Sequence, residues 1–457
     1  MKVMETWQTD PQDDSTPVNE RDHEVAHLRI LTGRSTRSIY EIRSKGVSIG
    51  RVGSDSDIVI DDGRMSRRHA RIERSSGGWR LQDLHSTNCG FVDGRGFGSG
   101  ARTPLGSEAV IRLGDTLMVF RAAVPLDDGR ADSPIFPGVS VVAAEVRQRL
   151  QALAAGTGHV LILGETGTGK ERIARAFGEF RASQPFVTLN AAELTRELAR
   201  SELFGHVRGA FTNAGANKAG LVDSAGDGVL FLDEIGELAI DVQADLLRFL
   251  EDGSYRPVGS TELRRSNARL VAATHVDLDQ AVQHGTFRRD LLARLRASNP
   301  PLKLPPLRER REDILAWTQL FFRQAGRDID EPWTAGALEC LLLYPWDENL
   351  RGLGGAVNLV LTRTSSFPCK TEHLPPEVVE HRAKLRGSPG TRASGESTPQ
   401  RPDPSKAEIE TALVETQGNM RLAARRLGIH RRKLYRLCER FGIAHESFRA
   451  EPQRKDE

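Results

Sequence analysis

The residues Gly164–Glu171 read GETGTGKE and follow directly after the apolar run Val160–Leu163. An apolar run that ends in a glycine-rich turn and continues into a helical pattern is typical of a strand, turn and helix in a parallel sheet. Such a turn aims backbone N–H groups at phosphate oxygens, and a lysine at the position of Lys170 reaches the β and γ oxygens of a nucleotide. Because the chain has 43 glycines, this pattern alone is weak evidence, and a nucleotide site needs a second element.

A second element is the run Val229–Glu234, in which an apolar segment ends in the carboxylates Asp233 and Glu234. Buried strands rarely end in paired acids without a function, although a solvated turn is the alternative for the pair alone. A third apolar run, Leu270–Ala273, follows after helical patterns, as in a parallel α/β sheet. Together these features predict an ATPase that uses ATP, with Glu171 where the general P-loop pattern has a Ser or Thr that binds Mg²⁺.

The length and composition of the whole chain limit the number of domains, the kinds of partner and the compartment that we expect. At 457 residues, the chain is long enough for about three domains. Lys and Arg number 64 and Asp and Glu 62, a net charge of +2, so any nucleic-acid surface must be local. The four cysteines lack metal-binding spacing and fit unpaired thiols in a reducing compartment. Since no apolar run approaches the roughly 18 residues of a membrane span, we expect a cytoplasmic protein with no membrane partner.

The sequence pattern divides the chain into domains. From residue 25 to residue 123, short alternating segments such as Ile58–Ile60 are separated by Gly, Asp and Asn, which predicts an all-β sandwich. The predicted fold class is multidomain: this sandwich, an α/β P-loop domain with a helical lid, and a small all-α helix-turn-helix. The predicted boundaries are 1–24 for a disordered lead, 25–123 for the sandwich, 124–134 for a linker, 135–380 for the P-loop domain with its lid, 381–404 for a second linker, 405–445 for the helix-turn-helix, and 446–457 for a tail.

The segment Glu202–Ala214 reads ELFGHVRGAFTNA and places Phe211 among glycine, alanine and threonine. The segment has no helical or strand period, and neighbours this small cannot bury an aromatic ring between them. The ring is better explained as an exposed contact that a loop presents to a partner.

This run resembles the GAFTGA loop of the bacterial enhancer-binding proteins, which are AAA+ activators that remodel RNA polymerase carrying sigma-54. Asn213 stands where the family pattern has its second glycine. Because asparagine tolerates positive φ better than most residues, we expect a working but stiffer loop. The resemblance implies contact with sigma-54 by Gly209, Ala210, Phe211, Thr212, Asn213 and Ala214.

The resemblance extends over about Ile135–Val379 and implies roles at the nucleotide site. Glu234 would polarise the attacking water, and Asp233 would hold Mg²⁺ through a water molecule. Asn190, in LNAAEL, matches the family asparagine that restrains the catalytic glutamate until the nucleotide is sensed. The residues implied to bind ATP are Gly164, Glu165, Thr166, Gly167, Thr168, Gly169, Lys170, Glu171, Thr274 and Arg351.

Two arginines in GTFRRDLLARL, Arg288 and Arg294, match the paired arginine fingers of the family and complete its catalytic set. A finger from a neighbouring subunit stabilises charge on the transferring phosphoryl group, so hydrolysis would require a ring, which we expect to be a homohexamer. For a lone arginine, a surface ion pair would be the better interpretation, but the surrounding pattern favours fingers.

Two positions near the site depart from the family pattern. His275 follows Thr274 where the family usually has asparagine, and Asp347–Glu348 replace the usual Pro-Gly ahead of Asn349. In contrast, LPPLRERREDI at Leu304–Ile314 matches the start of the helical lid.

Within the predicted sandwich, three motifs fall in the order and spacing of a forkhead-associated (FHA) domain: Gly50–Arg51, Ser66–Ala70 and Ser86–Asn88. A guanidinium, a hydroxyl and an amide suit a phosphate group and a peptide backbone. The resemblance implies a phosphothreonine protein or peptide from a Ser/Thr kinase as partner. We expect His69 to pack and hydrogen-bond inside the domain, as lone histidines in turns usually do. A sandwich kept only as an oligomerisation spacer is the alternative. The implied phosphothreonine-binding residues are Arg51, Ser66, Arg67, Thr87 and Asn88.

The basic segment from Lys406 to about Ile443 has apolar stripes at helical spacing, and the short gap at Gly428 is that of a helix-turn-helix. It resembles the Fis-type helix-turn-helix that closes many enhancer-binding proteins, with His430–Arg440 as the recognition helix. The stripes are Ile409, Ala412 and Leu413, then Leu422, Ala423 and Leu427, then Leu434 and Leu437. The residues expected to contact enhancer duplex DNA are His430, Arg431, Arg432, Lys433 and Arg436.

These features predict a phosphothreonine-regulated activator that binds enhancer DNA and uses ATP to remodel closed complexes of sigma-54 RNA polymerase. One alternative is a DNA-bound repressor or scaffold with ATPase activity that no longer engages sigma-54, motivated by Asn213, His275 and the altered lid motif. A second alternative is a remodeller of another protein whose tail binds RNA.

Overall fold

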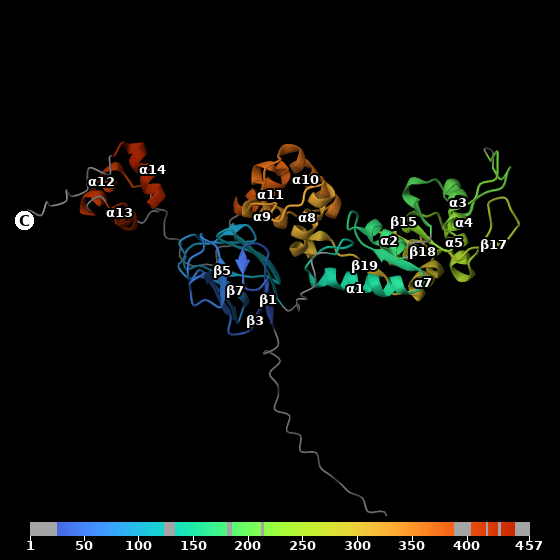
Figure 1. Ribbon diagram of the computed structural model, residues 1–457, viewed down its shortest axis with the longest axis horizontal. Coiled ribbons are helices and arrows are strands. Elements are labelled where there is room, and N and C mark those ends of the chain that lie inside the picture. The colour runs from blue at the N-terminus through green and yellow to red at the C-terminus, as the bar shows by residue number, and fades with distance from the viewer. Residues whose placement is uncertain are drawn as a thin grey trace, which may run out of the picture. The chain divides into compact units, whose positions relative to one another are not determined.

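The computed structural model describes residues 25–122, 133–180, 185–211, 214–387, 404–416, 419–427 and 431–443. The predicted lead at 1–24 and the predicted tail at 446–457 lie outside these ranges, as do most residues of the two predicted linkers. The chain divides into two compact units, one ending at residue 388 and the other beginning at residue 389. Figure 1 shows the elements of both units in chain order by colour.

The first unit begins with the predicted β-sandwich. One sheet has the strand order β3-β1-β12-β11-β8-β9 and the other the order β10-β7-β6-β4-β5-β2. The alternating segments are strands, as predicted, and their inward side chains form one apolar core that includes Ile49, Ile60, Trp79 and Phe120. The strands are β1 (Ala26–Ile30), β2 (Arg34–Ser35), β3 (Ile39–Ile42), β4 (Val47–Arg51), β5 (Ile58–Asp61), β6 (Ala70–Ser75), β7 (Gly78–Asp83), β8 (Phe91–Val92), β9 (Arg95–Gly96), β10 (Arg102–Pro104), β11 (Glu108–Leu113) and β12 (Thr116–Ala122).

The P-loop domain is built on a parallel sheet of order β14-β15-β18-β13-β19. The three apolar runs are its central strands β13, β15 and β18, as predicted. Alternate residues of β15 enter two different cores: Val229 and Phe231 pack with α1 and α2, while Leu230 and Leu232 pack with α3, α4, α5 and α7. Both faces of the sheet are therefore buried, as a parallel sheet requires.

The bounds of these elements follow. The strands are β13 (Val160–Leu163), β14 (Phe186–Asn190), β15 (Val229–Asp233), β16 (Ser254–Tyr255), β17 (Arg264–Arg265), β18 (Arg269–Thr274) and β19 (Leu302–Lys303). The helices are α1 (Val141–Ala155), α2 (Lys170–Glu179), α3 (Arg196–Phe204), α4 (Leu221–Ala225), α5 (Ile240–Asp252), α6 (Leu278–Gln283) and α7 (Arg289–Ser298), with the 3₁₀ turns η2 (Ala191–Glu193), η3 (Ile235–Glu237), η4 (Leu307–Glu309) and η5 (Arg311–Asp313).

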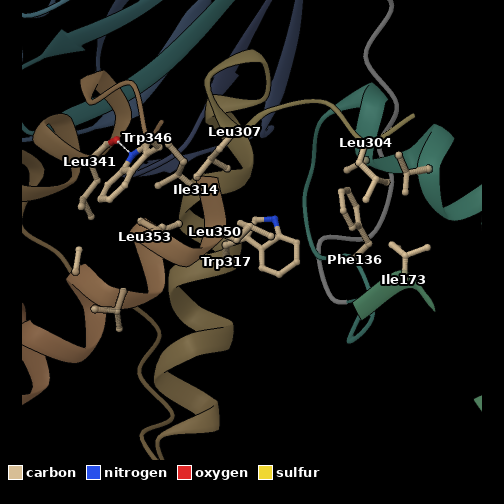
Figure 2. Packing of buried hydrophobic residues seen from close by; sticks show 14 of the residues in the cluster. Phe136, Ile173, Leu304, Leu307, Ile314, Trp317, Leu341, Trp346, Leu350 and Leu353 are labelled. Atoms are coloured by element: carbon tan, nitrogen blue, oxygen red, sulfur yellow. Dashed lines mark hydrogen bonds between the residues drawn. The ribbon is translucent and has the colours of Figure 1, made fainter. Parts of the chain in front are cut away.

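A helical lid follows, consisting of α8 (Ile314–Gln324), α9 (Ala335–Leu343), α10 (Asn349–Arg363), η6 (Thr371–His373) and α11 (Pro376–Gly387). Its apolar side chains share one cluster with the P-loop domain, in which Trp317 lies between Leu350 of the lid and Phe136 (Figure 2). The indole N–H of Trp346 donates to Leu341 O at 2.7 Å and ties the α9–α10 connection to α9. The same cluster includes side chains of strands β11 and β12, so the sandwich packs against the lid.

The second unit contains α12 (Lys406–Glu415), α13 (Met420–Arg426) and α14 (Arg431–Phe441). Its core confirms the first and third predicted stripes, with Ile409, Leu413, Leu434 and Leu437 all buried. In the second stripe Ala423 is buried, but the inclusion of Leu422 was wrong: its side chain is 50% exposed, because Ala423 and Ala424 face the core instead.

The described part of the chain contains no helix with the length and apolar character to cross a membrane. Cys89, Cys340, Cys369 and Cys438 are free, as their spacing predicted.

Candidate nucleotide site and partner-contact sites

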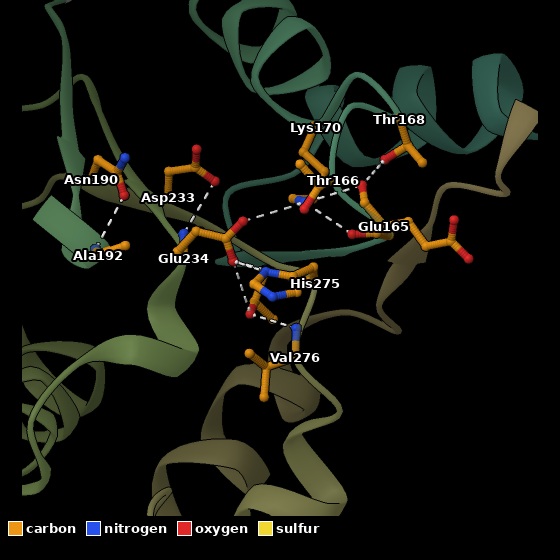
Figure 3. A network of polar contacts seen from close by, with 12 residues as sticks. Glu165, Thr166, Thr168, Lys170, Asn190, Ala192, Asp233, Glu234, His275 and Val276 are labelled. Carbon is orange, nitrogen blue, oxygen red and sulfur yellow. Dashed lines mark hydrogen bonds and ion pairs between the residues drawn. The ribbon is translucent and has the colours of Figure 1, made fainter. Parts of the chain in front are cut away.

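The P-loop connects the end of β13 to the first residue of α2, Lys170. Gly167 and Gly169 adopt φ of 77° and 105°, a left-handed conformation that glycine reaches without strain. A Cβ on Gly167 would also lie 2.1 Å from Glu348 O, so the loop requires glycine there. The Lys170 ammonium folds back onto the loop and donates to Gly164 O at 2.9 Å and to Glu165 O at 3.3 Å (Figure 3).

The carboxylate of Glu234 lies opposite this lysine. Its Oε1 is 3.6 Å from Lys170 Nζ, and its Oε2 accepts hydrogen bonds from His275 Nδ1 at 2.7 Å and from the His275 backbone N–H at 3.2 Å (Figure 3). Thr274 Oγ1 donates to the same oxygen at 3.4 Å. Burial acts to raise the pKa of Glu234, but the hydrogen bond from His275 and the charge of Lys170 outweigh it and hold this pKa below its ordinary value. The group is therefore held as a carboxylate, whose oxygens can accept a hydrogen bond from water.

Asp233 ends strand β15 beside Glu234. Burial, and then the charge of Glu234, raise the pKa of Asp233 above its ordinary value. Asp233 and Glu234 are adjacent carboxylates at the end of a strand, and the charged form of Asp233 is destabilised. A hard divalent cation, which prefers oxygen ligands, would stabilise that charge. The residues thus fit Mg²⁺ at Asp233.

Asn190 lies at the end of β14, next to Asp233 of β15 in the sheet. Its side-chain N–H donates to Glu193 Oε1 at 2.7 Å, and its oxygen accepts the backbone N–H of Ala192 at 3.2 Å. The structure therefore does not join Asn190 to Glu234, the carboxylate that this asparagine was predicted to restrain. His275 makes that contact instead.

The lid approaches the P-loop through the start of α10. The backbone N–H of Leu350 donates to Gly167 O at 2.9 Å, and the Asn349 amide donates to Thr166 O at 3.0 Å. Arg308 makes a bidentate ion pair with Glu165, at 2.7 and 2.6 Å. These contacts place the predicted lid residue, Arg351, at the nucleotide site.

A pocket of about 280 Å³ lies between the P-loop and the lid. It is lined by the P-loop residues, by Asp233 and Glu234, and by Arg351 together with the lid aromatics Trp317 and Phe321. Sequence reasoning missed the two aromatics, because their spacing on α8 gave no signal beyond that of a core-facing helix. The remaining predicted P-loop side chains are engaged locally: Thr168 Oγ1 donates to Glu165 O, and Glu171 pairs with Arg175.

The two predicted arginine fingers are absent from the lining of this pocket. Arg288 makes a bidentate pair with Asp290, at 3.0 and 2.6 Å, and Arg294 donates to Leu250 O at 3.0 and 2.9 Å. The structure therefore does not bring either guanidinium into the nucleotide site of its own chain.

The loop that carries Phe211 is a hairpin braced on the P-loop domain. At its base, the backbones of His206 and Lys218 exchange hydrogen bonds, and Gly209 N donates to Ala214 O at 2.8 Å. The Phe211 ring is 42% exposed and rests edge-on against the His206 ring at 4.9 Å. Thr212 and Asn213 of the predicted contact set lie outside the described residues.

Comparison with known proteins decides the family. The profile described as "Sigma-54 interaction domain" matches residues 137–299, and that of the "AAA+ ATPase lid domain" matches residues 308–389. The chain is 36% identical over 356 residues to the DNA-binding transcriptional regulator NtrC of Rhizobium meliloti, a match that spans 70% of this chain and 72% of NtrC. The chain belongs to the sigma-54 enhancer-binding regulators.

A further relative agrees with this family. Over 305 residues, the chain is 40% identical to the alginate biosynthesis transcriptional regulatory protein AlgB of Pseudomonas aeruginosa, which spans 66% of each chain. A crystal structure of NtrX from Brucella abortus is 28% identical, covers 67% of this chain and 69% of NtrX, and superposes with a TM-score of 0.46. The enhancer-binding regulator is thus an ATPase of the AAA+ class, as predicted.

The sandwich of this enhancer-binding regulator matches the profile described as "FHA domain" over residues 47–114. Its predicted phosphate loops lie together: Arg51 N donates to Ser66 O at 3.0 Å, Thr87 N donates to Ser66 Oγ at 3.0 Å, and the Asn88 amide donates to Arg64 O at 2.9 Å. The side chain of Arg67 is exposed beside them. His69 is fully buried, and its Nδ1 accepts the Ser66 N–H at 3.1 Å, which confirms that it packs internally.

The second unit matches the profile described as "Bacterial regulatory protein, Fis family" over residues 401–437. The predicted recognition helix corresponds to α14, and Arg436 is exposed on it. His430 lies outside the described residues, and α14 begins with the basic run Arg431–Lys433. The enhancer-binding regulator therefore carries a DNA-binding unit of the predicted type.

Proposed function

We propose that this regulator activates transcription by using ATP turnover to press the loop that carries Phe211 against sigma-54, which remodels the closed promoter complex. The observation that carries the proposal is the exposure of Phe211, 42%, at the end of a hairpin tied to the P-loop domain. A large aromatic side chain exposed on a braced loop is suited to a partner contact. Because the base of the hairpin belongs to the ATPase domain, movement at the nucleotide site would reach it through packed elements.

Hydrolysis would begin when phosphate oxygens replace the partners that Lys170 now has. Its ammonium donates to two P-loop carbonyls and lies 3.6 Å from Glu234, so a bound triphosphate would draw it away from both. Glu234, released from the lysine but still held by His275, would then orient and polarise the attacking water. Mg²⁺ at Asp233 would supply neutralising charge for the phosphates.

The catalytic set would be completed by a second copy of the chain. Arg288 and Arg294 do not line the nucleotide pocket of their own chain, whereas stabilisation of the transferring phosphoryl group calls for a guanidinium close to it. We therefore infer a closed ring, a homohexamer, in which each subunit presents these arginines to its neighbour.

Regulation would enter through the FHA domain. The hydroxyl of Ser66, the amide of Asn88 and the guanidinium of Arg67 belong to adjoining loops next to Arg51, which ends β4. These four groups form a donor set that suits a phosphothreonine peptide. We expect Arg51→Ala to abolish binding of a phosphothreonine peptide while basal ATPase activity remains. Unchanged peptide affinity in calorimetry would refute this assignment.

The sigma-54 contact is tested by binding in the presence of a transition-state analogue of ATP hydrolysis. We expect the wild-type protein to retain sigma-54 in gel filtration, and Phe211→Ala to lose it while ATPase activity persists. Phe180→Ala is the matched control, because Phe180 is a comparably exposed phenylalanine, 52%, at the end of α2. Retention of sigma-54 by Phe211→Ala would show that Phe211 is not the contact. Hydrolysis without any sigma-54 binding by the wild type would favour the DNA-bound scaffold instead.

A further inference from the structure

Strand β12 of the FHA domain carries Arg121 into contact with the segment that leads from the P-loop sheet to the lid. The Arg121 guanidinium makes a bidentate pair with Glu312, Nε to Oε1 at 2.9 Å and Nη2 to Oε2 at 2.8 Å. It also donates to Glu309 O at 2.9 Å and lies 3.2 Å from Glu108. The side chain of Glu312 is only 2% exposed, so its charge depends on this partner.

The same segment, which leads from the P-loop sheet to the lid, also contacts the P-loop. Arg308 makes the bidentate pair with Glu165, and Arg310, which is fully buried, donates to Thr168 O at 3.3 Å. Both arginines lie within four residues of Glu312. One short stretch of chain, η4 and η5, therefore contacts the FHA domain on one side and the P-loop on the other.

A second set of contacts fixes the FHA domain to the lid without Arg121. Glu339 of α9 is 1% exposed and lies 3.2 Å from Arg112 of β11, 3.1 Å from Arg382 and 3.2 Å from Arg386. The ring of Phe91 is covered by the guanidiniums of Arg112 and Arg386, at 4.2 and 4.6 Å. The domains would thus stay docked if Arg121 were removed, so a loss at the nucleotide site could be assigned to Arg121 itself.

We propose that Arg121 is a positioning residue of the nucleotide site: by holding Glu312 it fixes η4 and η5, and through Arg308 and Arg310 it fixes the P-loop. Without Arg121, Glu312 would keep a buried charge that lacks its bidentate partner, and the segment would shift to bring that charge toward water. The same shift would loosen the contacts of Arg308 and Arg310 with the P-loop. This inference deepens the proposed regulation, because it gives the FHA domain a physical route to the ATPase site.

The test compares the full-length protein with Arg121→Ala, with Glu312→Gln and with the swap Arg121→Glu plus Glu312→Arg. We expect Arg121→Ala to bind a fluorescent ADP analogue on the order of tenfold more weakly, within the range typical of coupling between two sites. Glu312→Gln, which gives Arg121 one neutral acceptor in place of the bidentate pair, should lose affinity in the same direction. The Michaelis constant for ATP should rise in parallel, while kcat at saturating ATP changes much less. The swap should recover only part of the affinity, because it restores an ion pair but places a carboxylate beside Glu108 and loses the donor to Glu309 O. Arg80→Ala is the matched control, because Arg80 pairs at 2.7 Å with Glu73 inside the sandwich.

Normal ADP affinity in folded Arg121→Ala and in Glu312→Gln would overturn the proposal. If Arg121→Ala does not fold, the near-isosteric Glu312→Gln decides alone. Phosphothreonine-peptide affinity should be unchanged in all variants, because Arg121 is not among the predicted phosphate-binding residues. Since the ADP measurement needs neither phosphopeptide nor sigma-54, its failure is distinguishable from failure of the proposed function.

Discussion

The hydrogen-bond donors to Glu234 differ from those that the family resemblance implies. The resemblance assigns its restraint to Asn190, whereas in the structure His275 donates twice to the carboxylate and Asn190 is bonded to Glu193. The sequence shows that His275 departs from the family pattern. It could not show that His275 contacts Glu234, because the two residues are 41 positions apart in the chain. The apolar runs and the P-loop, in contrast, carry their own local signals and were predictable.

At the residue scale, we expect His275→Ala to lower kcat for ATP hydrolysis by about tenfold, a part of the effect that a positioned general base supplies. The physical reason is that Glu234 would lose its 2.7 Å hydrogen bond and sample orientations unsuited to water. The Michaelis constant for ATP should change little, because the phosphate contacts remain. Steady-state ATPase assays measure both constants.

His275→Asn serves as the conservative control, since a side-chain amide retains a donor at this position. It should keep most of the wild-type kcat. A normal kcat in His275→Ala would contradict the positioning of Glu234 by this residue.

At the scale of elements, periodic segments were predictable and tertiary choices were not. Strands β13, β15 and β18 are continuous apolar runs, and both of their faces are buried. In α13 the apolar pattern did not decide which of the adjacent residues Leu422 and Ala423 faces the core. The packing of the three helices buries Ala423. A two-residue strand such as β8 has no pattern of its own and forms because it pairs with the longer strand β11.

His159, next to strand β13, makes the P-loop sheet sensitive to acid. Its Nδ1 accepts the Leu270 N–H of β18 at 3.1 Å, and burial, with the charges of Arg294 and Arg269, lowers its pKa from 6.5 to about 4. Between these two values the unfolded chain binds a proton that the folded chain does not. The free energy of unfolding should therefore fall as pH drops from 6.5 to 4, by about 3 kcal/mol in total.

Hydrogen exchange of the β18 amides between pH 7 and pH 5, corrected for intrinsic rates, measures this loss locally. His159→Asn offers an acceptor that does not titrate, so its pH dependence should be shallower than that of the wild type. Equal slopes for the two proteins would show that His159 does not carry the effect.

At the scale of the whole molecule, the identity of each domain was predictable and the docking of the FHA domain was not. In the sequence, Arg112 and Arg121 look like solvent-exposed residues of two strands. Glu339 of α9 and Glu312 of η5 likewise look like surface charges. Arg112 pairs with Glu339, and Arg121 with Glu312, only when the FHA domain packs against the lid. Each of these buried or half-buried charges is then stabilised by its partner. No local pattern in the sequence records such complementarity.

We propose that ATP hydrolysis by this regulator opens a sigma-54 promoter through Phe211. The most direct measurement is the permanganate reactivity of unpaired thymines on a sigma-54 promoter that carries a site footprinted by the purified protein. With sigma-54 polymerase and ATP, we predict reactive thymines for the wild type and none for Phe211→Ala, although both hydrolyse ATP. A wild-type protein that binds the site and hydrolyses ATP but leaves the promoter closed would contradict this mechanism.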